Sequence, residues 1–136
     1  MVILIPTKSP QETKSPQDWK ALLADPVKHW RRGYSAMSLA YCWEKANGFP
    51  QQVQKALSAV PELGTLEPLL AIPEHKVDIP GGRAASQNDL FVLARSPKGL
   101  VCIMVEGKVS EPFGPLVSEW CPLRWSQDRP CGVGAA

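Results

Sequence analysis

The stretch that decides the fold runs from Asn88 to Lys108 and reads NDLFVLARSPKGLVCIMVEGK. Two apolar, β-prone runs, at 90–94 and 100–105, flank a Ser-Pro-Lys-Gly segment whose proline and glycine suit the second and fourth positions of a type I turn. The pattern predicts a β-hairpin. Because both runs are apolar on both faces, we expect the hairpin to be central in its sheet and covered on both sides.

The turn also predicts which residues of the hairpin lie opposite each other. A turn centred between Pro97 and Lys98 places Asp89 opposite Glu106, with their Cβ atoms roughly 5 Å apart. Lys108 lies two residues further along the second strand, so it points to the same face. The following residues are expected to continue that face as packed core: Phe91, Leu93, Cys102 and Met104.

Two carboxylates this close repel each other, and a divalent cation relieves the repulsion. Mg²⁺ or Mn²⁺ accepts hard oxygen ligands with water in the remaining positions, and a metal-bound water can attack a phosphodiester. A lysine on the same face can orient that water or stabilise the charge that builds on the phosphate. The alternative is a surface salt-bridge cluster formed by Asp89, Glu106 and Lys108 at a sheet edge.

Asp89 before a hairpin and Glu106-Gly107-Lys108 after it resemble the PD-(D/E)XK nuclease superfamily, the restriction-endonuclease-like group. The resemblance implies that Asp89 and Glu106 bind the metal together with the backbone carbonyl of Gly107. It also implies that Lys108 is catalytic. Many members add a glutamate from a helix that precedes the sheet. Glu44 is the candidate here, although a solvated role for it is the simpler reading.

A wider stretch, from Trp19 to Trp120, is similar to an uncharacterised bacterial domain family within this superfamily. The similarity lies in DPVKHWRRGYSA, IPEHKVDIPGGRAASQNDLFVLAR and VEGKVSEPFG. The superfamily core runs helix, three strands, helix, strand, but only 28 residues follow Lys108. We therefore expect an α/β fold, restriction-endonuclease-like and incomplete at its C-terminus. Its mixed central sheet would carry helices on both faces. An early or shifted reading-frame end near Trp120, or a second chain that completes the fold, would account for the gap.

The N-terminal half predicts one strand followed by helices. Residues 2–5 are β-prone, and the duplicated hexapeptides TKSPQE and TKSPQD follow at 7–18. The spacing of apolar residues predicts helices over 16–24, over 36–46 with Ser35 as N-cap, and over 51–59. A short strand or a packed irregular segment is expected over 66–72. The domain organisation is thus a strand and linker at 1–18, a nuclease-like domain at 19–120 and an irregular tail at 121–136.

A basic cluster lies between the first two predicted helices, at residues 28–32. It is either a solvated loop with a buried Trp30 or a loop that contacts phosphate groups. The net charge of +2 is too small to indicate nucleic-acid binding by itself. The candidate nucleic-acid-binding residues are Lys28, Arg31, Arg32, Arg83 and Gln87.

Composition excludes several classes of protein. A chain of 136 residues with 44% hydrophobic and 21% charged residues is one folded domain rather than a disordered segment. No apolar run approaches the ~18 residues of a membrane span, and the N-terminal residues are not expected to form a secretory signal. The four cysteines lack CxxC spacing, so a zinc ribbon is not expected and reduced thiols are the default.

The sequence therefore predicts a metal-dependent nuclease-like domain that hydrolyses phosphodiester bonds, with DNA as the expected substrate and Mg²⁺ or Mn²⁺ as cofactor. The alternative is a non-catalytic remnant of the fold that serves as an interaction or nucleic-acid-binding module. We expect a cytoplasmic protein with a nucleic-acid partner and no membrane partner. A homo-oligomer, or a further chain that completes the fold, is also expected.

Overall fold

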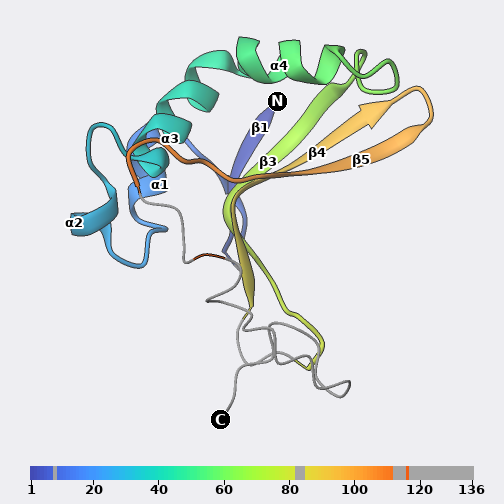
Figure 1. Cartoon of the computed structure of the whole chain (residues 1–136). Coiled ribbons are helices and arrows are strands. Elements are labelled where there is room, and N and C mark those ends of the chain that lie inside the picture. Colours follow the sequence, from blue (N-terminus) through green and yellow to red (C-terminus); the bar gives the residue numbers. More distant parts are fainter. Residues whose placement is uncertain (8, 82–84, 112–115, 117–136) are drawn as a thin grey trace.

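The structure, a computed structural model, describes residues 1–7, 9–81, 85–111 and 116 (Figure 1). Within these residues a five-stranded sheet has the strand order β2-β1-β3-β4-β5. The strands are β1 (Val2–Ile5), β2 (Gln11–Glu12), β3 (Glu67–Val77), β4 (Ser86–Ser96) and β5 (Gly99–Val105). The helices are α1 (Pro16–Lys20), α2 (Pro26–His29), α3 (Ser35–Ala46) and α4 (Gln51–Ser58).

The sheet is mixed. β1 pairs with β3 in parallel, whereas the β1–β2, β3–β4 and β4–β5 pairs are antiparallel. A parallel pair needs a long connection, and here residues 6–66 supply it with all four helices. The α/β class with a mixed central sheet and flanking helices is thereby confirmed.

The core lies between α3 and the middle of the sheet. Ala40 and Trp43, three residues apart on one face of α3, are buried, with Trp43 only 1% exposed. They belong to one cluster with Ala71 of β3 and Leu90 of β4. The other buried members of the cluster are Ile3, Trp19 and Val92. Small alanines on both layers let the helix approach the sheet closely around the Trp43 indole.

Helix boundaries follow local signals, with two corrections. Asn47 ends α3 in the left-handed conformation at φ 47°, as its Asn-Gly pair predicts. The first helix ends at Lys20 rather than at residue 24, because Pro26 begins a helix of its own, α2, capped by the Asp25 side chain. Ser35 is the first residue of α3, and Tyr34 is its N-cap.

The predicted register of the hairpin is confirmed. Ser96 pairs with Gly99 across the turn, and the ladder continues to Leu90 opposite Val105. Gly99 has a φ of 135°, which side chains other than glycine rarely adopt, so this turn requires its glycine.

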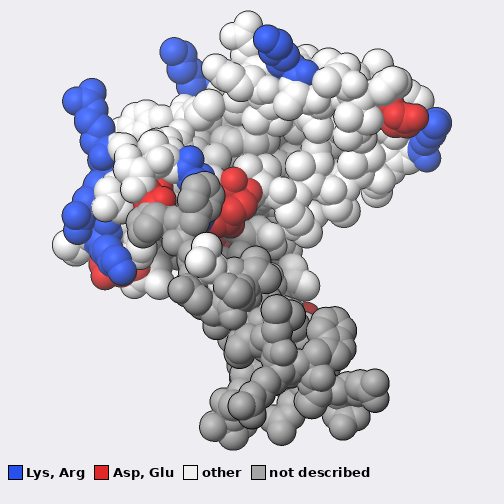
Figure 2. All heavy atoms as spheres, viewed as in Figure 1, with Lys and Arg blue, Asp and Glu red and all other residues white. Residues whose placement is uncertain are grey.

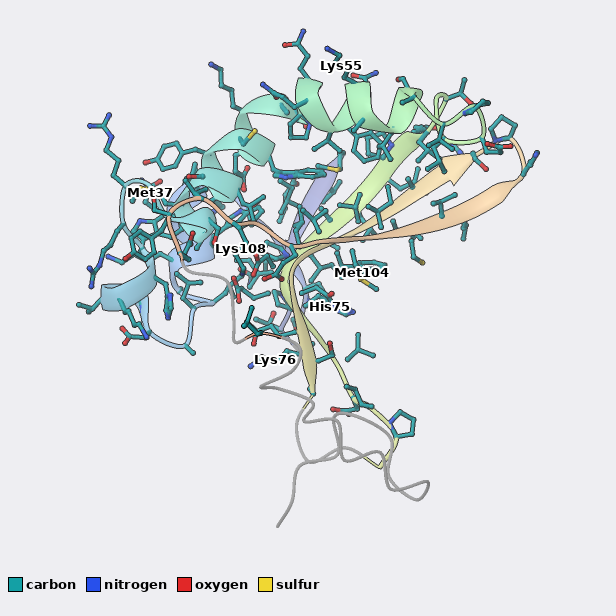
Figure 3. The ribbon with its side chains drawn as sticks, viewed as in Figure 1. Met37, Lys55, His75, Lys76, Met104 and Lys108 are labelled. Carbon is teal, nitrogen blue, oxygen red and sulfur yellow. The ribbon has the colours of Figure 1, made fainter. Side chains whose placement is uncertain are left out.

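The prediction that the hairpin is central and covered on both sides is wrong for the described chain, where β5 is the edge strand. Leu90, Val92 and Ala94 face the helices and are fully buried. On the other face of the hairpin, Cys102 is exposed and Met104 is 51% exposed. Figure 3 shows Met104 on the side of β5 away from α4. Apolar alternation predicts what a face is made of but not what covers it, which is why this prediction failed.

Phe91 and Leu93 on that same face are half-buried, so the packed-core prediction holds for them only in part. Two segments are also more ordered than predicted. Gln11–Glu12, in the first hexapeptide copy, pairs with β1 instead of remaining a linker. β3 continues through Pro73 to Val77. Pro73 lies beyond Leu70 and Ala71, the residues that pair with β1, so at Pro73 the described part of the sheet has a neighbouring strand on one side only. Proline is tolerated at such a position.

Two predictions fall outside the described residues: the position of Arg83 and the irregular tail at 121–136. In the part of the chain that is described, no helix has the length and apolar character to cross a membrane.

Trp43→Ala should lower the free energy of unfolding by about 3–5 kcal/mol, because it removes the largest fully buried side chain and leaves a cavity. Urea denaturation followed by circular dichroism measures the change. Tyr41→Ala, on the same helix but 48% exposed, is the matched control and should cost less than about 1 kcal/mol. Equal losses in the two variants would mean that α3 does not pack as described.

Candidate active site

The proposed catalytic residues meet where the β4–β5 ladder ends. Leu90 opposite Val105 is the last pair, so the next positions are Asp89 of β4 and Glu106, the residue directly after β5, as predicted. The Asp89 carboxylate accepts a hydrogen bond from the Gly107 backbone N–H at 2.7 Å to Oδ2. Asp89 therefore fixes the chain that leaves β5.

Glu106 and Lys108 form an ion pair with each other. The Lys108 Nζ atom lies 2.5 Å from Glu106 Oε1, and the side chains are 39% and 59% exposed, respectively. The hydrogen bond to Glu106 raises the pKa of Lys108 above its ordinary value, so the amine holds its proton at neutral pH. Figure 3 shows Lys108 near the junction of the helical layer and the strands.

Ionisation of the Asp89 carboxyl is unfavourable in the folded protein. Burial raises the pKa of its carboxyl above the ordinary value, and the neighbouring charge of Glu106 raises it further. The Gly107 hydrogen bond and the Lys108 charge oppose this rise without cancelling it. A site of this kind gains from any added positive charge, because a cation stabilises the ionised form.

Glu74 of β3 is a third acid at this end of the sheet, and the sequence did not single it out. It lies between Pro73, which pairs with Leu90, and His75, which pairs with Asn88, and so it is next to Asp89 across the ladder. Burial raises the pKa of Glu74, with smaller contributions from the charges of Asp89 and Glu106, while a hydrogen bond from the Gln87 amide opposes them. Because the predicted strand ended before Pro73, nothing in the sequence placed Glu74 beside the hairpin.

Gly107 touches the first turns of α3. A Cβ atom at this position would lie 2.7 Å from Leu39 Cδ1 and 3.1 Å from Ser35 Cβ, so a side chain here would displace the Leu39 side chain. Glycine in the middle of the Glu106-Gly107-Lys108 triplet thus lets the backbone pack directly on the helix.

Glu111 joins the same region to α3. Its Oε1 atom accepts hydrogen bonds from the Ser35 backbone N–H at 2.5 Å and the Ser35 hydroxyl at 2.6 Å. Its Oε2 atom accepts one from the Val109 N–H at 3.0 Å. Burial raises the pKa of Glu111, but these hydrogen bonds outweigh it and lower the pKa to about 2.

Glu44, the candidate additional ligand, has another partner. Its Oε1 atom accepts a hydrogen bond from the Trp19 indole N–H at 2.8 Å, which ties α1 to α3. Within the described residues, no hydrogen bond or ion pair joins Glu44 to Asp89 or Glu106.

The basic cluster lies on α2 and the turn after it. Lys28, Arg31 and Arg32 are all exposed, and Figure 2 shows Lys and Arg atoms along the helical end of the molecule. The Arg31 guanidinium lies 5.7 Å from the centre of the Tyr34 ring. Trp30 is half-buried against the core, which agrees with the predicted buried indole in part. Gln87 lies away from this cluster, on β4.

The acidic side chains of the site do not form a complete metal-binding group by themselves. Among residues 1–7, 9–81, 85–111 and 116, no group of three or more His, Cys, Asp or Glu side chains is arranged to hold a metal ion. The pair formed by Asp89 and Glu106 is therefore the candidate, and water would complete the coordination of a cation bound there.

A family model described as "Domain of unknown function (DUF6946)" matches residues 12–130. The matched range contains α1 to α4, β3 to β5 and all the acidic residues of the candidate site. It also extends past Trp120 into the segment that the sequence predicts as an irregular tail. No curated protein and no solved structure matches the chain.

Asp89→Asn should stabilise the fold at pH 7. Because the pKa of Asp89 is raised in the folded state, the folded protein binds this proton more tightly than the unfolded chain does. The protonated carboxyl therefore stabilises the fold, and this stabilisation is lost as pH rises through the folded-state pKa. The neutral amide keeps an acceptor for Gly107 and avoids this loss, so Tm should rise by about 2 °C or more.

Differential scanning calorimetry at several pH values tests this. The difference between variant and wild type should shrink below the unfolded pKa of 3.8, where both side chains are neutral. Asp78→Asn, at an exposed position after β3, is the control and should leave Tm unchanged. A lower Tm for Asp89→Asn at pH 7 would contradict the electrostatics described here.

Proposed function

The chain belongs to the Domain of unknown function (DUF6946) family, whose description gives no activity, and we propose from the site itself that it is a metal-dependent, nuclease-like domain that hydrolyses phosphodiester bonds. DNA is the expected substrate, and Mg²⁺ or Mn²⁺ the expected cofactor. The observation that carries the proposal is that Asp89 of β4 lies close enough to Glu106, the residue directly after β5, for the two charges to interact, with Lys108 2.5 Å from Glu106.

The residues present fit a Mg²⁺ or Mn²⁺ ion. Mg²⁺ in phosphoryl-transfer sites is commonly held by one or two carboxylates and keeps several waters, which is what Asp89 and Glu106 can offer. Asp89 uses Oδ2 for Gly107, and we assign Oδ1 to the cation. Glu106 is 59% exposed, so its carboxylate can turn away from Lys108 at little cost.

The chain's own groups would share the work as follows. A bound cation would supply an activated water and charge stabilisation at the phosphate. Once Glu106 faces the cation, the protonated Lys108 amine is free to stabilise negative charge that develops on the phosphate oxygens. Lys28, Arg31 and Arg32 would attract the nucleic-acid backbone without reading its sequence.

Two residues implied by the superfamily resemblance have different support. The Gly107 backbone is held by its hydrogen bond to Asp89 and by packing against Leu39, which keeps this residue next to the two candidate carboxylate ligands. Glu44 would have to give up its hydrogen bond with Trp19 to reach a cation. The proposal therefore depends on Asp89, Glu106 and Lys108.

A non-catalytic module is the second candidate function, and one observation favours it. The Glu106–Lys108 ion pair satisfies both charges without a metal. A remnant of the fold that binds nucleic acid or another protein has no need of a cation at this position. Metal binding and cleavage therefore separate the two functions.

Titration calorimetry with Mn²⁺ should show binding with a dissociation constant of about 1 mM or tighter, because two carboxylates attract the ion and water completes its coordination. Asp89→Ala should abolish the heat of binding. Asp78→Ala removes an exposed acid directly after β3 and should bind like the wild type. Retained binding by Asp89→Ala would show that the cation lies elsewhere.

Cleavage of supercoiled plasmid DNA in Mg²⁺ or Mn²⁺ tests the reaction. Lys108→Ala should lose on the order of a hundredfold in rate while it still binds Mn²⁺, because a preorganised donor acts mainly on the transition state. Lys55→Ala, an exposed lysine on α4, is the matched control and should cut normally. The double variant Arg31→Ala with Arg32→Ala should weaken substrate binding and its dependence on salt.

Two results would count against the nuclease. Equal cleavage by Lys108→Ala and wild type would mean that the assigned site is wrong. A wild-type protein that cuts neither DNA nor RNA with any divalent metal, yet binds nucleic acid, would favour the non-catalytic module.

A further inference from the structure

The segment that carries Glu106 and Lys108 lies outside the strand ladder. β5 ends at Val105, so no backbone pairing with β4 extends to residues 106–111. Residues placed this way drift unless other contacts hold them. Three contacts do so here: the Asp89 bond to Gly107, the packing of Gly107 on Leu39, and the hydrogen bonds of Glu111.

Glu111 makes the most extensive of these contacts. One oxygen accepts both the backbone N–H and the hydroxyl of Ser35, 76 residues away in the chain, and the other accepts the N–H of Val109. The carboxylate thus links the first turn of the 12-residue α3 to the residue directly after Lys108. Gly33, in the turn before α3, also approaches the Ser110 side chain.

The start of α3 needs such a partner. Its N-cap, Tyr34, makes no side-chain capping hydrogen bond, so the free N–H groups of the first turn lack a local acceptor. A carboxylate at this end also interacts favourably with the helix dipole. Glu111, from a distant part of the chain, provides the side-chain hydrogen-bond acceptor that a Ser, Thr or Asp residue at the N-cap usually provides.

We propose that Glu111 is a positioning residue, which anchors residues 106–111 to the start of α3 and so keeps Glu106 and Lys108 beside Asp89. This inference rests on the proposed function, because it assigns to Glu111 the alignment of the proposed metal ligand and the proposed catalytic lysine. Both Glu111 carboxylate oxygens already accept hydrogen bonds from Ser35 and Val109, so the role assigned to Glu111 is positioning and not metal ligation. Partners that orient metal ligands in this way typically contribute about 10–100-fold to metal affinity.

Two measurements on the full chain test the proposal. The first is the Mn²⁺ dissociation constant, which should increase about tenfold in Glu111→Ala. Glu111→Gln keeps one carbonyl oxygen for Ser35 and should recover part of the affinity. The second is hydrogen exchange at the Gly107 amide, followed by NMR, which should accelerate at least about tenfold in Glu111→Ala as the bond to Asp89 opens more often.

Two controls separate positioning from general loss of stability. Ile3→Val trims a buried side chain of β1 and should lower Tm without changing Mn²⁺ affinity. Glu67→Ala removes an exposed acid that pairs with Arg95 away from the site, and it should change neither readout. If Ile3→Val weakens Mn²⁺ binding as much as Glu111→Ala does, Glu111 acts only through stability and the proposal fails.

The outcomes also separate this proposal from the proposed function. Wild-type affinity in Glu111→Ala, in a protein that binds Mn²⁺ through Asp89, would overturn the positioning role alone. If the wild type binds no Mn²⁺, the metal-dependent function fails, and the Gly107 amide then decides the anchoring by itself. Unchanged exchange there would overturn it, and faster exchange would support it.

Discussion

Everything in this structure depends on the packing of α3 against the middle of the sheet. Trp43 and Ala40 are buried against Ala71 and Leu90, and this contact fixes how deep the helix lies over β3 and β4. Because the helix is fixed there, its first turn reaches the end of the β4–β5 hairpin. Gly107 can then pack against Leu39, so that contacts with α3 position the chain that follows β5.

The electrostatics of the hairpin end oppose the stability of the fold. Glu74 and Asp89 both have raised pKa values, mainly because burial disfavours their charges, and Glu106 adds to the repulsion. Glu111 shows the opposite behaviour, because hydrogen bonds from Ser35 and Val109 stabilise its charge. Hydrogen bonds to Glu74 and Asp89 offset only part of the cost of burial. Carboxylates with raised pKa values beside a protonated lysine occur in functional sites and also in structural ion-pair networks.

Local signals predicted much of the hairpin and of the helical layer. The Ser-Pro-Lys-Gly turn determined the pairing register, and with it the meeting of Asp89 and Glu106. Apolar spacing predicted α3 and α4 to within a residue or so. The sequence pattern predicts neither the full length of β3 nor the one-turn helix α2, because a proline such as Pro73 or Pro26 usually indicates the end of an element. Proline is also tolerated where a strand has one neighbour and at the start of a helix.

The sequence by itself determined the hairpin, its register and the residues that could meet at its end, since turn chemistry and strand alternation act over a few residues. Only the tertiary structure placed Glu74 beside Asp89. It also formed the hydrogen bonds between Glu44 and Trp19 and between Glu111 and Ser35. It also left one apolar face of β5 open among the described residues, with Met104 51% exposed. These outcomes depend on how the helices pack against the sheet, which joins residues that are far apart in the sequence. A pattern of neighbouring residues does not specify such contacts.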